Sequence, residues 1–208
     1  MNFKISYAIT ACNEHEELTE LLSFLLENKR PEDEVVLQID ESNHSREVKE
    51  VADSFGDLIT KIEFFPLDND FAKFKNNLKT HCTGDYIFQL DADELPGLEI
   101  VQNLHLILDA NPEVDLFVVP RVNTVSGLTE EHISKWNWRV NEQNWVNWPD
   151  YQYRIFKNLF NIKWQNKVHE IIVGANTMSQ LPAEEKFSIL HHKKIAKQEK
   201  QNTFYETI

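Results

Sequence analysis

The sequence predicts an α/β domain in which helices flank a mostly parallel central sheet. Apolar residues alternate from Phe3 to Ile9, as is typical of a strand. The segment after Asn13 changes to the spacing of an amphipathic helix. Strand and helix patterns alternate through residues 1–120. Because this alternation is typical of crossover connections, it favours parallel strands.

The first helix is predicted to run from Asn13 to the approach of Pro31. Leucines at positions 18, 21, 22, 25 and 26 form one apolar stripe. Asn13 and Glu16 have the spacing of a capping box. A strand rich in Val and Ile is then expected over residues 34–40.

Further strands and helices follow in the same order. A helix with apolar residues at positions 48, 51, 52 and 55 is expected to end at Gly56, and a strand is expected around Ile62. Asp70 is placed to cap a third helix. The apolar run from Tyr86 to Leu90 predicts a buried central strand.

The regular pattern ends after one more helix, over residues 100–108, and a strand over residues 116–119. Residues 121–149 are irregular but contain four tryptophans, a composition that argues against a linker. Strands are expected at 151–155, 168–173 and 188–191, and a terminal helix at 196–205. We expect one domain, with an α/β core over residues 1–120 and a second segment over residues 121–208.

Composition excludes several classes of protein. A net charge of −13 should repel a phosphate backbone, so nucleic acid is not an expected partner. Cys12 and Cys82 are too few for a disulfide scaffold, which predicts reduced thiols and a cytoplasmic location. No apolar run is long enough for a transmembrane segment, and no signal peptide is recognised. The basic tail from Lys186 is read as a solvated helix face, with contact to the inner membrane face as the alternative.

The most informative motif is Asp91-Ala92-Asp93, which directly follows the predicted buried strand. Open parallel sheets bind ligands at the carboxyl ends of their strands. Two carboxylates separated by one residue can hold Mn²⁺ or Mg²⁺ and leave positions for diphosphate oxygens. The alternative is that these acids only end the strand or cap the next helix.

Other strand ends bring polar groups to the same edge. Thr10, Cys12 and Glu14 follow the first strand, and Asp40 ends the second. From the third helix, Lys75 and Asn76 could reach a base or a phosphate. The combined pattern predicts a nucleotide site along this edge of the sheet.

These motifs follow one another from the end of the first strand to the run from Gly84 to Glu94. In the order of these motifs, the sequence resembles glycosyltransferase family 2. The resemblance implies a GT-A fold with a nucleotide-sugar-binding core and an acceptor-side segment. It also implies that Asp40 reads the base and that Asp91 and Asp93 hold the metal on the diphosphate of a nucleoside diphosphate sugar. The sequence departs from the common family pattern after the first two strands, and Lys75 stands where the family commonly has Arg.

The second half is more loosely similar to short bacterial members that act on cell-envelope oligosaccharides, which suggests a glycan or lipid-linked acceptor. An inverting transferase needs a carboxylate that takes the proton of the acceptor hydroxyl. Glu170 is the first candidate for this base and Asp150 the second. His191 is the preferred third metal ligand, against the alternative of a structural histidine. The tryptophans are read either as a sugar platform or as packing.

These features favour a metal-dependent glycosyltransferase, and the family resemblance implies that the transfer inverts the anomeric carbon. A nucleotidyltransferase is the first alternative, because paired aspartates on an open sheet also suit attack on a nucleoside triphosphate. The chain has five glycines and no glycine-rich phosphate loop, which counts against that alternative. A non-catalytic module that binds nucleotides or sugars is the second alternative.

Overall fold

The computed structural model describes the backbone of residues 3–205 and the side chains up to residue 200. In this part of the chain, nine strands form one sheet and two further strands form a hairpin. The strands of the main sheet are β1 (Ile5–Ala11), β2 (Glu34–Asp40), β3 (Lys61–Phe65), β4 (Tyr86–Asp91), β5 (Glu94–Pro96), β6 (Leu116–Ser126), β7 (Val146–Lys157), β10 (Met178–Gln180) and β11 (Ile189–Lys194). The hairpin consists of β8 (Lys163–Gln165) and β9 (Ile171–Val173).

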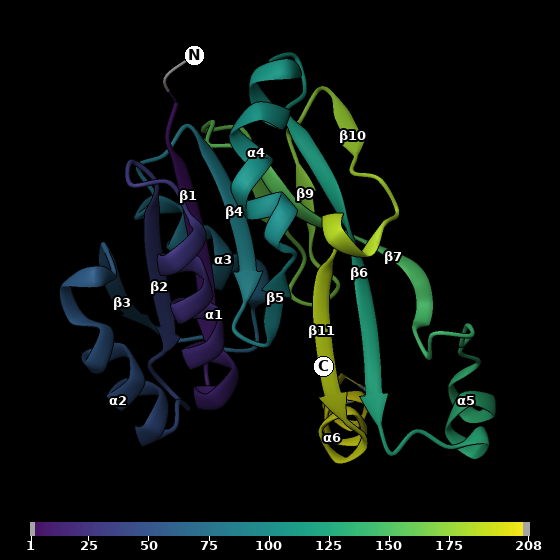
Figure 1. Cartoon of the computed structure of the whole chain (residues 1–208). Coiled ribbons are helices and arrows are strands. Elements are labelled where there is room, and N and C mark those ends of the chain that lie inside the picture. The colour runs from purple at the N-terminus through teal and green to yellow at the C-terminus, as the bar shows by residue number, and fades with distance from the viewer. Residues whose placement is uncertain (1–2, 206–208) are drawn as a thin grey trace.

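Six α-helices lie in the described residues (Figure 1). They are α1 (His15–Asn28), α2 (Arg46–Phe55), α3 (Phe71–Thr80), α4 (Leu98–Ala110), α5 (Glu130–Trp136) and α6 (Ile195–Tyr205). Helix α5 lies apart from the sheet, beyond the end of β6 (Figure 1). None of the helices in the described part of the chain is long and apolar enough to cross a bilayer.

The order of strands in the main sheet is β3-β2-β1-β4-β7-β6-β11-β5, and β10 pairs with β6. The first four strands are parallel, as predicted. β7 runs antiparallel between β4 and β6, whereas β11 is parallel to β6. The sheet is therefore mostly parallel, and strands from the second half of the chain extend it beyond β4.

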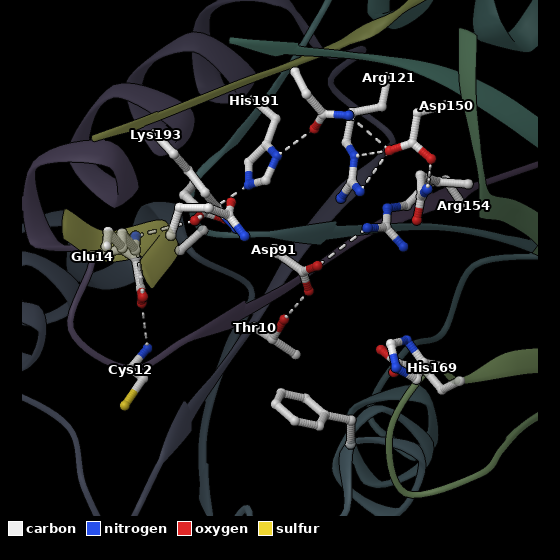
Figure 2. Close-up of a pocket in the computed structure, with 18 of the residues that line it drawn as sticks. Thr10, Cys12, Glu14, Asp91, Arg121, Asp150, Arg154, His169, His191 and Lys193 are labelled. Carbon is white, nitrogen blue, oxygen red and sulfur yellow. Dashed lines mark hydrogen bonds and ion pairs between the residues drawn. The ribbon is translucent and has the colours of Figure 1, made fainter. Parts of the chain in front are cut away.

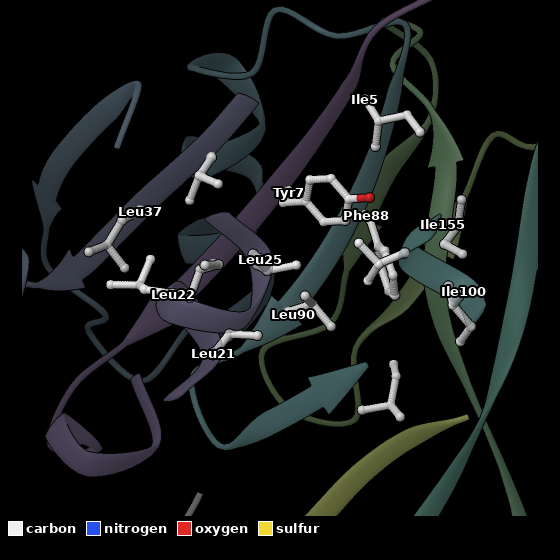
Figure 3. Packing of buried hydrophobic residues seen from close by; sticks show 14 of the residues in the cluster. Ile5, Tyr7, Leu21, Leu22, Leu25, Leu37, Phe88, Leu90, Ile100 and Ile155 are labelled. Carbon is white, nitrogen blue, oxygen red and sulfur yellow. The ribbon is translucent and has the colours of Figure 1, made fainter. Parts of the chain in front are cut away.

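The larger hydrophobic core lies between the sheet and the helices α1, α2 and α4. The leucine stripe of α1 points into it, and Leu18, Leu22 and Leu25 have no exposed surface. Figure 3 shows Leu22 and Leu25 in the same core as Tyr7 and Phe88, whose ring centroids are 5.8 Å apart. Burial of each such side chain contributes roughly 1.5–3 kcal/mol, so this face holds α1 on the sheet.

A second core covers the opposite face, where α3 and the β8-β9 hairpin pack on the sheet. Leu78 of α3 and Phe156 of β7 are buried there beside Trp164 of β8. The rings of Phe156 and Trp164 meet edge to face with centroids 6.0 Å apart. This packing fixes the hairpin beside the carboxyl-end edge of the sheet.

The predicted helix boundaries are partly right. Asp70 caps α3 by accepting a hydrogen bond from Lys73 N at 2.9 Å, and Gly56 ends α2 with a positive φ of 46°. The expected capping box of Asn13 and Glu16 is wrong, because α1 begins at His15 without a side-chain cap. Instead, the carboxylate of Glu14 accepts from the backbone amides of Cys12 and Asn13.

The segment expected to be irregular is more ordered than predicted. β6 continues to Ser126, α5 follows, and β7 begins at Val146, so only the connections between them are irregular. Only residues 171–173 of the expected strand at 168–173 form a strand, because residues 166–169 form a bend. The strands β5, β8 and β10 were not predicted; each has three residues, which is too short for a periodic pattern.

Candidate active site

A cleft of about 600 Å³ opens at the carboxyl ends of β1, β2 and β4 and extends to β6, β7 and β11. It brings together all but one of the site residues predicted from the sequence. Those that line it are Thr10, Cys12, Glu14, Asp40, Lys75, Asp91, Ala92, Asp93, Asp150, Glu170 and His191. Asn76 is the exception, because its side-chain amide exchanges two hydrogen bonds with the backbone of Trp164. Asn76 holds the β8-β9 hairpin on α3, and we do not retain it as a ligand-binding residue.

Asp91 lies at the centre of the cleft (Figure 2). One carboxylate oxygen accepts from Thr10 Oγ1 at 2.8 Å and lies 3.5 Å from Lys75 Nζ. The other accepts from Arg154 Nη2 at 3.1 Å. Burial opposes the charge on Asp91, but Lys75 and Arg154 outweigh it and hold the pKa of this carboxyl well below its usual range. Asp91 is therefore ionised at neutral pH.

Asp93 is held by two side chains from the C-terminal part of the chain. Its Oδ2 lies 3.5 Å from His191 Nε2 and accepts from Lys197 Nζ at 3.1 Å. Burial opposes its ionisation, but His191 and then Lys197 hold the pKa of Asp93 well below its usual value. Lys197 Nζ also lies 3.5 Å from Glu14, so it connects both carboxylates to α6.

Next to these aspartates, Glu94 is buried under the cleft with 1% of its surface exposed. It accepts two hydrogen bonds from Arg154, at 3.0 and 2.7 Å, and one from Arg121 at 3.0 Å. Arg154 is thus shared between Glu94 and Asp91. The two arginines fix the orientation of the carboxylates around them and neutralise part of their charge.

At the other end of the cleft, Asp40 closes β2. Its Oδ1 accepts from the backbone amides of Ser42 and Leu67, and its Oδ2 lies 3.8 Å from Cys12 Sγ. Burial, with smaller contributions from Glu14 and Asp40, raises the pKa of Cys12 to about 12. The thiol therefore stays protonated, and Cys12 is a wall of the cleft rather than a nucleophile.

The two candidate bases have different surroundings. Glu170 accepts from Lys75 Nζ at 2.5 Å, and Lys75 itself is 3% exposed. Asp150 lies on β7 and accepts from Arg121, Asn123 and Gln152 at 2.7–3.0 Å. Burial opposes the charge on Asp150, but Arg121 outweighs it and lowers the pKa of Asp150. Both carboxylates face the cleft, Glu170 on the side of α3 and Asp150 on the side of β6.

Two lysines of the C-terminal segment line the cleft, which contradicts the expectation that the basic tail from Lys186 is a solvated helix face. Lys193 is 8% exposed and lines the cleft with Lys197, and burial lowers the pKa of Lys193. On β11, His191 and Lys193 are two residues apart and share the buried face of the strand. That alternation was present in the sequence and could have placed Lys193 beside His191.

Comparison with known proteins gives one matching family and a set of solved structures with a similar fold. The family described as "Glycosyl transferase family 2" matches residues 6–184. Among solved structures, S. aureus TarS 1–349 in complex with UDP matches with a TM-score of 0.64 and 15% identity over 91% of this chain. The same TarS segment in complex with UDP-GlcNAc matches with a TM-score of 0.62 and 16% identity over 93% of this chain. A comparison with curated protein sequences gives no match.

This chain covers 60% and 59% of the two TarS structures, so it corresponds to only part of their length. The low identities limit the structural comparison to the fold, which is the GT-A arrangement of a mostly parallel sheet between helices. The family match says more than the fold, because it rests on the sequence itself and spans residues 6–184 of 208. The chain belongs to glycosyl transferase family 2.

Proposed function

We propose that this protein transfers a sugar from a nucleoside diphosphate sugar to an acceptor hydroxyl. The observation that carries the proposal is the position of Asp40, Asp91 and Asp93 in one cleft, at the carboxyl ends of parallel strands. The similar TarS structures contain UDP and UDP-GlcNAc, which supports a nucleotide-sugar donor. Family membership supports the same class of reaction.

In this proposal, the donor lies along the edge of the sheet. Asp40 has a carboxylate oxygen near Cys12 that can accept from a base N–H, so the base is assigned to this end. The diphosphate is assigned to the region of Asp93, where Lys193 and Lys197 add positive charge. The transferred sugar then lies near Asp91, between the two candidate bases.

The residues around Asp93 fit a divalent cation in part. Within the described residues, no three His, Cys, Asp or Glu side chains form a complete metal site. His191 Nδ1 lies 2.7 Å from Asn123 Oδ1, and in the neutral tautomer in which Nδ1 donates to that oxygen, Nε2 faces Asp93 as a potential ligand. Asp91, Asp93 and His191 would hold Mn²⁺ or Mg²⁺ together with donor oxygens. A bound cation would offset charge on the departing diphosphate.

We assign the general base to Asp150 in preference to Glu170. Lys75 joins Glu170 to Asp91, so Glu170 belongs to the donor side of the cleft. Asp150 lines the cleft together with Trp138, Val146 and Asn147, and we assign the acceptor to this side. Its lowered pKa keeps it ionised at neutral pH, which is the protonation state that a general base requires.

Transfer would proceed by direct displacement with inversion. The acceptor oxygen forms a bond to the anomeric carbon while the bond from that carbon to the diphosphate breaks. The acceptor proton passes to the Asp150 carboxylate, and the nucleoside diphosphate leaves with the bonding electrons. Arg121 would orient Asp150 through its two hydrogen bonds, at 3.0 and 2.8 Å.

The first experiment measures release of nucleoside diphosphate from a panel of nucleotide sugars, with and without Mn²⁺. Metal-dependent release, with water as a slow acceptor, is the expected result. Binding without release would indicate a non-catalytic module. Pyrophosphate formed from a nucleoside triphosphate would indicate nucleotidyl transfer instead.

A second experiment separates the two candidate bases. Asp150→Asn should retain donor binding and lose transfer by about 100-fold or more, a typical contribution of a general base. Glu170→Gln should instead weaken donor binding, because it disturbs the ion pair with Lys75. Retained transfer in Asp150→Asn together with lost transfer and normal donor binding in Glu170→Gln would move the base to Glu170.

A further inference from the structure

The four tryptophans of residues 136–148 fall into two groups. Trp145 and Trp148 pack edge to face, with ring centroids 4.8 Å apart, and neither lines the cleft. Trp136 packs against Trp138, with centroids 4.7 Å apart. Of these four side chains, only Trp138 lines the cleft in the described structure. Three of them therefore support the segment, and one faces a ligand-sized space.

We infer that Trp138 forms the platform of a subsite for a neutral saccharide acceptor. The inference rests on the proposed function, because a bound saccharide is an acceptor only if the protein transfers a sugar. The binding of a saccharide at Trp138 can nevertheless be tested without any transfer. It adds to the proposal the chemical class of the acceptor and the residue that binds it.

The backbone around Trp138 is held by hydrogen bonds on both sides. Helix α5 ends at Asn137, which adopts the left-handed conformation, and Trp138 N donates to Ile133 O at 3.0 Å. On the other side, Arg139 N donates to Asn147 Oδ1 at 3.0 Å, and Asn147 N donates to Arg139 O at 2.7 Å. A platform fixed in this way loses little conformational entropy when a ligand stacks on it.

The same contacts connect Trp138 to the candidate base. Asn147 follows Val146, which pairs with Asn123 across β6 and β7. Asn123 Nδ2 in turn donates to Asp150 Oδ2 at 2.8 Å. Trp138 and Asp150 thus line one cleft and share a short path of pairings, so a sugar stacked on the indole can direct a hydroxyl toward Asp150.

The chemistry of this side of the cleft favours a neutral saccharide over a phosphorylated polyol. A sugar ring presents an apolar C–H face and a rim of hydroxyls, which match an indole flanked by amides such as Gln152. An anionic acceptor would need a cation that is not already neutralised. Arg121, on this side of the cleft, is paired with Asp150 and Glu94, and Arg139, next to Trp138, is exposed and does not line the cleft.

The test uses methyl β-glucoside, methyl β-galactoside and methyl N-acetyl-β-glucosaminide as probes, with glycerol phosphate as the anionic comparison. Binding to the full chain is measured by saturation-transfer NMR and by titration of the indole N–H resonances. Trp138→Ala should weaken binding of the preferred glycoside about tenfold, equivalent to about 1.4 kcal/mol. Trp138→Phe should retain most of the binding. Trp145→Phe is the matched control and should bind as the wild type does.

Three results would overturn the inference. The first is equal glycoside affinity in wild type and Trp138→Ala, and the second is binding of glycerol phosphate but of no glycoside. The third is binding of no probe to the wild type when nucleoside diphosphate and Mn²⁺ are present. Nucleoside diphosphate binding is measured separately in each variant. Its absence from the wild type would contradict the proposed function, whereas glycoside binding that depends on Trp138 would still support a saccharide site.

Discussion

Replacement of Glu94 by Gln should test whether buried charge organises the cleft. Glu94 is 1% exposed and accepts hydrogen bonds from Arg121, from Arg154 and from the backbone amide of Asp91. Glutamine keeps the shape but removes the charge that compensates the buried guanidinium of Arg154 and the partly buried one of Arg121. Breaking a buried ion pair by removing one partner costs about 3–5 kcal/mol. Because the amide oxygen of Gln can still accept a hydrogen bond, we expect a loss of about 3 kcal/mol in the free energy of unfolding.

Urea denaturation with linear extrapolation measures this loss. The matched control is Glu50→Gln on α2, where Glu50 is 56% exposed and pairs with Arg46 at 2.7 Å. An exposed pair of this kind contributes about 0.5 kcal/mol. The comparison therefore separates the effect of burial from the loss of an ion pair as such.

The same variant should also affect the site, because Arg154 donates to both Glu94 and Asp91. Without the Glu94 charge, Arg154 can shift toward Asp91, and nucleotide-sugar binding should weaken. A Glu94→Gln protein within about 0.5 kcal/mol of wild type, like an exposed pair, would refute this reasoning. So would a Glu94→Gln protein with unchanged nucleotide-sugar affinity.

Three further predictions concern other parts of the chain. Asp93→Asn should abolish the increase in nucleotide-sugar affinity caused by Mn²⁺, measured by titration, and an unchanged increase would exclude Asp93 as a ligand. Glu34 is buried, which opposes its charge, but hydrogen bonds from Lys4 and Ser6 outweigh burial and lower the pKa of Glu34 below 4.5. Its contribution is present above the unfolded pKa and lost as pH falls through the folded value, so Glu34→Gln should cost about 1.5–3 kcal/mol at neutral pH and progressively less below about pH 4.5. A constant difference between pH 7 and pH 3 in urea titrations would contradict this. Gly174→Ala should destabilise the fold by more than about 2 kcal/mol, because Gly174 has φ 88° and a Cβ would lie 1.9 Å from the backbone oxygen of Asn161; an unchanged melting temperature would refute this.

The part of the site that could be predicted from sequence depends on local patterns. Thr10, Asp40 and Asp91 lie at the carboxyl ends of parallel strands. The carboxyl ends of neighbouring parallel strands meet at the same edge of the sheet. Strand periodicity was therefore enough to place these residues at one edge. The backbone of Ala92 also donates to Thr10 O at 2.9 Å, which continues the register of β1 and β4 into the motif.

The part of the site that could not be predicted depends on pairings between segments that are distant in the sequence. Glu94 lies on β5, which pairs with β11, and β11 in turn pairs with β6, which carries Arg121. These two pairings make Glu94 the counter-ion of Arg121. No local period indicates that residue 94 lies beside residue 121. Lys197 reaches Asp93 only because α6 follows β11 at the rim of the cleft. The sequence pattern of a polar helix does not distinguish such a lysine from a solvated one.

The charge of the cleft differs from that of the whole protein, and this difference bears on how an anionic donor would bind. The chain carries a net charge of −13. Among the described residues that line the cleft, five are Lys or Arg and six are Asp or Glu, which gives a formal charge of −1. The overall field would therefore slow the approach of a nucleoside diphosphate sugar, and the cleft itself would not attract it strongly. One divalent cation would change the formal charge of the cleft from −1 to +1, so charge balance supports the proposed role of Mn²⁺ or Mg²⁺ in donor binding, as does the Asp91 and Asp93 motif.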